Sequence, residues 1–176
     1  PGLSDQVAQI FNMEGIYHSG LCRAIQLNIV WPDVYEVKRI MERFPEMQII
    51  FQLSHKAAQG KTPKEIADGI EQYGDALAYA LIDPSAGRGV EFDVGESVSV
   101  FQELRGRLPL LGIGFAGGFT GKNVYDRFKE LIERTGTRDF SIDAEGGLRD
   151  KITDDYGDDL LNIGKVKAYL EAAHKV

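Results

Sequence analysis

Short apolar segments and amphipathic segments alternate five times along this chain, and no hairpin turn joins two of the apolar ones. The apolar segments read as strands at 24–30, 47–53, 77–83, 110–118 and 139–147. The segments around them carry apolar residues at helical spacing, which predicts helices at 4–14, 31–44, 61–74, 96–109, 121–136 and 162–176. Strands separated by helices form parallel sheets covered by helices. The sequence therefore predicts an α/β protein of parallel βα repeats.

Two of the expected helices carry clear end signals. Thr62 precedes Pro63, which is the usual order of a capping residue and the first helical residue. Gly136 follows the last periodic residue of the helix at 121–136, where a left-handed residue commonly ends a helix.

Two architectures fit this pattern. Five βα units match the count of a flavodoxin-like open sheet. A (β/α)8 barrel needs eight strands and about 250 residues, so its assignment here implies that strands are missing at the N-terminus. The chain has 176 residues with no linker or low-complexity segment, and we expect residues 1–176 to form a single α/β domain.

Composition limits the classes of function. The chain is 43% hydrophobic and 27% charged, with a formal net charge of −7. We expect no nucleic-acid partner, because such proteins usually present a cluster of Lys and Arg. The single cysteine, Cys22, excludes an intramolecular disulfide and a metal site built from several thiolates. No apolar run approaches the roughly 20 residues that span a bilayer, and we expect a cytoplasmic protein without a membrane partner.

Glycines cluster at the ends of two successive strands. Gly117 and Gly118 follow one strand, in a 112–124 segment that holds five glycines, and Gly146 and Gly147 follow the next. Exposed amides in a turn without Cβ atoms can bind phosphate. In a barrel, the loops after strands seven and eight commonly form one phosphate site. The alternative is that the glycines only permit tight turns and relieve crowding in the sheet.

Asp83 ends a strand that otherwise reads as buried. A carboxylate at this end of a parallel strand lies where α/β proteins build active sites. It is a candidate general acid or base. The alternative is that Asp83 caps amides in an Asp-Pro-Ser turn.

These elements, in this order, resemble phosphoribosylanthranilate isomerase of tryptophan biosynthesis. That family has a strand ending Leu-Leu-Asp, a Gly-rich loop, a strand ending Ala-Gly-Gly-Leu and a last strand with Ser-Gly-Val-Glu. The corresponding segments here are Leu81-Ile82-Asp83, the loop at 86–93, Ala116-Gly117-Gly118-Phe119 and Asp143-Ala144-Glu145-Gly146-Gly147. An earlier strand, Ile25-Gln26-Leu27-Asn28, is similar to that family's Val-Gln-Leu-His.

The resemblance implies a TIM-barrel fold of which this chain covers strands four to eight. It implies an isomerase that performs an Amadori rearrangement, with Asp83 as the general acid. Gly117, Gly118, Gly146 and Gly147 would bind phosphate, and Gln26, Arg88 and Gly89 would bind the rest of the substrate. It implies a phosphorylated small molecule as partner, and neither a cofactor nor a metal.

The same resemblance indicates what this chain lacks. The family's catalytic cysteine on strand one and an arginine on strand two have no counterpart, and Cys22 precedes strand four. We therefore expect the 176 residues alone to show almost no isomerase activity. The competing hypothesis is a degenerate, non-catalytic phosphosugar-binding protein. For His18, His55 and His174 we expect surface or packing roles.

Overall fold

A computed structural model describes residues 2–14, 19–20, 22–84, 94–150 and 159–176. Its main sheet has five parallel strands whose order follows the sequence. They are β1 (Ala24–Leu27), β2 (Gln48–Ser54), β3 (Tyr79–Asp83), β4 (Gly112–Ala116) and β5 (Ser141–Asp143).

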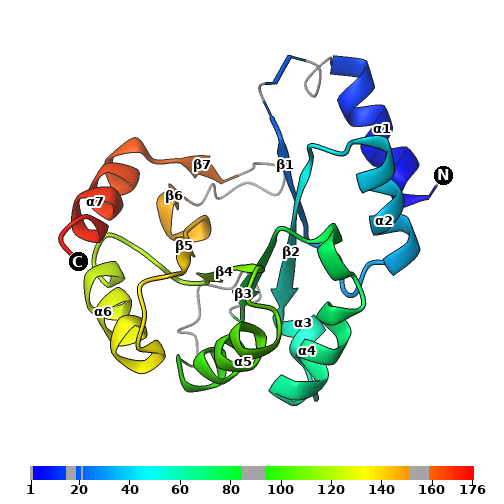
Figure 1. Ribbon diagram of the computed structural model, residues 1–176. Coiled ribbons are helices and arrows are strands. Elements are labelled where there is room, and N and C mark those ends of the chain that lie inside the picture. Colours follow the sequence, from blue (N-terminus) through cyan, green and yellow to red (C-terminus); the bar gives the residue numbers. More distant parts are fainter. Residues whose placement is uncertain (1, 15–18, 21, 85–93, 151–158) are drawn as a thin grey trace.

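The helices lie on an arc outside these strands (Figure 1). They are α1 (Leu3–Glu14), α2 (Val34–Arg43), α3 (His55–Ala58), α4 (Pro63–Glu71), α5 (Val94–Arg107), α6 (Val124–Thr135) and α7 (Ile163–Ala173). Two short 3-10 turns, η1 (Gly74–Ala76) and η2 (Gly146–Leu148), complete the helical elements of the described residues. A small antiparallel pair, β6 (Arg149–Asp150) with β7 (Leu160–Leu161), follows η2.

The strand order decides between the two predicted architectures. A flavodoxin-like sheet places its first strand between the second and third, and its helices cover both faces. Here the strands follow in order from β1 to β5, with the helices on one side. This is the winding of a βα-barrel type, as predicted, and the flavodoxin-like alternative is wrong. β1 and β5 are the two edges of the sheet within the described residues.

The core lies between the sheet and the helices. Alternate strand residues point outward to the helices, and Ile49, Phe51, Ile113 and Phe115 among them are at most 2% exposed. On the helix side, Val37 and Ile40 of α2 are fully buried. The inner face of the sheet is more open, since Tyr79 remains 40% exposed. The inner face is therefore the surface on which a ligand could reach strand side chains.

The expected helix signals are present. Thr62 and Glu65 form a capping box at the start of α4, with Pro63 in its first turn. Gly136 adopts φ 70° directly after α6, a left-handed conformation that glycine takes without steric cost. Some boundaries differ from the expectation. β1 ends at Leu27 rather than at 30, and the expected strand at 139–147 divides into β5 and η2. The sequence analysis also missed α3, β6 and β7.

Candidate functional site

The carboxyl ends of β1 to β5 form the edge of the sheet that we call the C-terminal edge. Backbone register places Ser54 beside Asp83 and Ala116 beside Asp143. Asp83 closes β3 with only 7% of its surface exposed, and Asp143 closes β5 and remains exposed. The edge thus carries two carboxyl groups, and only Asp83 was singled out by the sequence.

A chain of side-chain hydrogen bonds leads to Asp83 across the inner face. The Nε2 atom of Gln52 donates to Oδ2 of Asp83 at 2.6 Å. The Nε2 atom of Gln26 donates to Oε1 of Gln52 at 2.8 Å. Gln26, predicted to bind substrate, is therefore linked to the predicted acid through a residue that the sequence analysis missed. The available signal was a polar residue inside an apolar strand, two positions before its end.

Asp143 is electrostatically coupled to its neighbours. Its pKa is raised, first because surrounding atoms remove water from the carboxyl group, and then because Glu145 and Asp83 are negatively charged. The pKa of Tyr169 on α7 is raised to about 12, mainly by burial and also by the charge of Asp143. The C-terminal edge beside β5 is therefore acidic.

The first glycine turn has an open backbone conformation. Gly117 and Gly118 have φ values of 106° and 66°, a region that other residues adopt only with strain. Asn123 fixes the turn, because its Nδ2 donates to the Gly118 carbonyl at 2.9 Å and its Oδ1 accepts from the Thr120 amide at 2.8 Å. Among the hydrogen bonds of the described residues, none uses the amide of Gly117 or Gly118 as donor.

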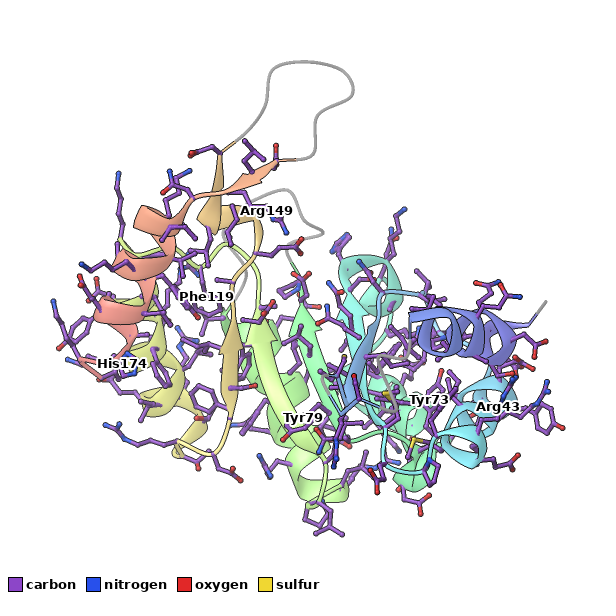
Figure 2. The ribbon with its side chains drawn as sticks, turned by 90° about the horizontal axis from the view of Figure 1, so that it is seen from above. Arg43, Tyr73, Tyr79, Phe119, Arg149 and His174 are labelled. Carbon is purple, nitrogen blue, oxygen red and sulfur yellow. The ribbon has the colours of Figure 1, made fainter. Side chains whose placement is uncertain are left out.

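The second glycine turn lies against the first. A Cβ atom on Gly147 would overlap the carbonyl oxygen of Phe119 and lie 2.9 Å from Cγ2 of Thr120. Gly146 is exposed, and a Cβ atom there would meet nothing within 4 Å. Figure 2 shows Phe119 between the sheet and α7, and Phe119 is 1% exposed. The two predicted phosphate turns are thus neighbours, although their binding of phosphate stays a prediction.

The two glycines inside β4 have a packing role. A Cβ atom on Gly112 would overlap the ring of Tyr79, and one on Gly114 would lie 2.9 Å from Cδ1 of Leu81. Both side chains belong to the neighbouring strand β3 and lie over β4 on the inner face. The relief of crowding considered from the sequence accounts for these two glycines, whereas Gly117 and Gly118 lie beyond the strand.

A cavity of about 340 Å³ opens on the inner face of the sheet. Its wall includes an aromatic ring, aliphatic side chains, an amide, a hydroxyl group and a carboxyl group. The lining residues are Gln26, Ile50, Tyr79, Ala80, Leu81, Gly114, Ser141, Ile142 and Asp143. Tyr79 lies toward the opposite end of the sheet from Arg149 (Figure 2). The cavity therefore runs along the sheet and reaches the C-terminal edge at Asp143.

Two cationic side chains near the second glycine turn make polar contacts, although Nε of Arg149 is buried without a partner. Arg149 pairs with Glu145 at 3.4 Å and donates to the carbonyl oxygen of Asp159 at 2.9 Å. Lys165 pairs with Asp150 at 2.7 Å. An anion at the turns could therefore use backbone amides and the remaining Nε–H of Arg149.

The remaining candidate residues are placed as follows. Arg88 and Gly89 lie outside the described residues, as does His18. Cys22 donates to the Ala24 carbonyl at 3.1 Å, at the start of β1 and so away from the C-terminal edge. His55 and His174 are exposed. Within the described ranges, no three His, Cys, Asp or Glu side chains come together as a metal site would require.

Comparisons with known proteins find similarity among solved structures. No family model matches the chain, and no curated protein matches it. Among solved structures, it is similar to the putative copper homeostasis protein CutC from Streptococcus agalactiae, with 13% sequence identity and a TM-score of 0.47. The match covers 68% of this chain and 53% of that protein, so the chain spans about half its length. In the described part of the chain, no helix is both long and apolar enough to cross a membrane.

Proposed function

We propose that this chain binds a phosphorylated sugar derivative at the C-terminal edge of its sheet. The observation that carries the proposal is the contact between the two glycine turns, where Gly147 lies directly on Phe119 and Thr120. Phosphate would accept hydrogen bonds from the amides of both turns. The organic part of the ligand would extend toward Asp83 and the cavity on the inner face.

The two glycine turns provide backbone amide donors that an anion can approach closely. The amides of Gly117 and Gly118 have no acceptor within the described residues, and the absence of Cβ atoms lets a phosphate approach the main chain. The neighbouring charges of Asp143 and Glu145 oppose an anion. Protonation of Asp143 on ligand binding would reduce that repulsion. Its raised pKa makes this protonation less costly than for an ordinary aspartate.

For the chemistry, we propose an aldose–ketose type isomerisation of a phosphoribosyl amine, as in the phosphoribosylanthranilate isomerase family. Asp83 would give its proton to the ring oxygen as the bond from that oxygen to carbon 1 breaks. Gln52 holds the Asp83 carboxyl group in one orientation through its 2.6 Å hydrogen bond. Removal of the proton from carbon 2 is assigned to no residue of this chain.

One observation favours a second candidate, a phosphosugar-binding protein without turnover. The only cysteine, Cys22, lies at the opposite end of β1 from the C-terminal edge. It could not reach a substrate held by the glycine turns. Binding and turnover must therefore be tested separately.

The binding experiment is a titration with inorganic phosphate and ribose 5-phosphate, followed by phosphorus NMR. The Gly117→Asp variant adds bulk and negative charge at the turn, and we expect its affinity for both ligands to fall at least about tenfold. Gly136→Asp is the matched control, because Gly136 also has a positive φ (70°) and a Cβ atom there meets nothing within 4 Å. Equal affinity of the wild type and Gly117→Asp would remove the proposal, and binding without turnover would select the second candidate.

A further inference from the structure

Each hydrogen bond between Gln26, Gln52 and Asp83 has a fixed donor and a fixed acceptor. An ionised carboxylate accepts hydrogen bonds and cannot donate them. The atom of Gln52 that lies 2.6 Å from Asp83 Oδ2 must then be the amide nitrogen, as observed. The side-chain oxygen of Gln52 then faces Gln26. It accepts a hydrogen bond from the amide nitrogen of Gln26 at 2.8 Å.

The burial of Gln52 restricts the orientation of its amide group. Gln52 is 9% exposed, so water cannot readily replace a missing partner of its amide group. A buried polar group without a hydrogen bond costs about 1–3 kcal/mol. Gln52 therefore cannot reverse its amide unless both of its partners change their roles at the same time.

Gln26 differs because it is exposed and lines the cavity on the inner face. While its nitrogen is engaged by Gln52, its carbonyl oxygen remains for a ligand in the cavity. If Asp83 becomes protonated, its hydroxyl group can donate to the oxygen of a reversed Gln52. Gln52 then donates to Gln26, and Gln26 must turn its own amide group toward the cavity.

We propose that Gln26 and Gln52 form an amide relay that links the protonation state of Asp83 to the group that Gln26 presents to the ligand. With Asp83 ionised, Gln26 offers an acceptor and favours ligands with a hydroxyl or amine donor at this point. With Asp83 protonated, Gln26 offers a donor and favours a carbonyl or ether oxygen. Gln52 is thus a positioning residue and Gln26 a specificity-determining one.

The relay itself does not depend on catalysis, whereas its role in a reaction rests on the proposed function of Asp83 as an acid.

Other ionisable groups surround Asp83, and their effects on the Gln26 signal must be distinguished from that of Asp83. Asp143 and Glu145 lie at the end of β5, Tyr169 lies on α7, and His55 follows Ser54, the register partner of Asp83.

The test is an NMR titration of the ligand-free chain from acidic to neutral pH. It follows the side-chain amide signals of Gln26 and Gln52 and the carboxyl carbon of Asp83. We expect the Gln26 amide to shift with the same midpoint as the Asp83 carboxyl carbon. Gln48, which lies on the same face at the far end of β2 and is exposed, is the control and should not follow it.

Two variants separate a relay from a direct electrostatic effect. In Gln52→Met, Asp83 should still titrate while Gln26 no longer follows it. In Asp83→Asn, the shift of Gln26 should disappear even though Asp143 and Glu145 remain. A Gln26 signal that ignores Asp83 in the wild type, or that still follows it in either variant, overturns the relay. Because no ligand is used, this failure is distinct from a failure of phosphate binding.

Discussion

Gly147 lies so close to the carbonyl oxygen of Phe119 that the space for a Cβ atom between them does not exist. The contact joins the turn after β5 to the turn after β4, and both contacting groups are backbone. Backbone cannot rotate away as a side chain can. The position of one glycine turn is therefore set by the other.

Gly147→Ala should lower the free energy of unfolding by about 1–3 kcal/mol, the usual cost of overpacking a tight contact. It should also weaken phosphate binding, because the two turns must move apart. Chemical denaturation and a phosphate titration measure the two effects. Gly146→Ala is the matched control, since a Cβ atom there meets open space and should change stability little. Equal stability of the two variants would contradict the close contact.

The overall winding could be predicted from the sequence because it depends on local patterns. Apolar runs such as that at 47–53 and the periodic segment of α6 each carry enough information to identify one element. The alternation of these elements then leaves few topologies. Repeated Gly-Gly pairs at successive strand ends favoured the barrel-type winding over the open sheet, and the strand order agrees.

The details of the site could not be predicted because they depend on register between strands. Gln52 has a role only because its strand aligns it with Asp83 on one side and Gln26 on the other. Likewise, the packing role of Gly112 and Gly114 becomes visible only when the side chains of the neighbouring strands β3 and β5 are placed over them. A single sequence gives the face of a residue within its strand, but not its partner on the next strand.

Asp83→Asn tests whether Asp83 is the general acid, and the test applies to any form of the protein that shows measurable turnover. Asparagine keeps the shape of the carboxyl group but cannot supply its proton. Turnover should fall by roughly 10²–10⁴-fold, the range expected for a lost general acid. Affinity for ribose 5-phosphate, measured by calorimetry, should change little. Normal turnover in the variant would show that Asp83 is not the acid.

Tyr73→Phe tests a buried hydrogen bond beneath the loop after β1. The Tyr73 hydroxyl donates to the Pro32 carbonyl at 2.6 Å, next to Trp31, whose φ of 48° is strained. Loss of this bond should destabilise the fold by about 0.5–1.5 kcal/mol in chemical denaturation. Tyr35→Phe is the control, because Tyr35 is 69% exposed and should tolerate the change. Burial also raises the pKa of Tyr73 to about 12, which an ultraviolet titration can detect.

The last prediction concerns the pH dependence of stability through Asp143. Its pKa in the folded chain is raised above the ordinary value of 3.8, first because neighbouring atoms displace water from part of this exposed side chain, and then by the charges of Glu145 and Asp83. At a pH between 3.8 and the raised pKa of the folded chain, Asp143 binds more protons in the folded chain than in the unfolded chain. The contribution of Asp143 to the free energy of unfolding therefore decreases as pH rises through that interval.

Asp143→Asn removes this difference in proton binding between the folded and unfolded chains, and it keeps the size of the side chain. At neutral pH the variant should have a higher Tm than the wild type, because an unfavourable charge is gone. Well below pH 3.8, where Asp143 is protonated in both the folded and unfolded chains, the difference in Tm should disappear. Thermal denaturation across this pH range measures both limits. Asp75→Asn is the control, because Asp75 is exposed in η1, which precedes β3 and lies away from the C-terminal edge. A lower Tm for Asp143→Asn at neutral pH would show that the Asp143 carboxylate is stabilised by the fold rather than opposed by it.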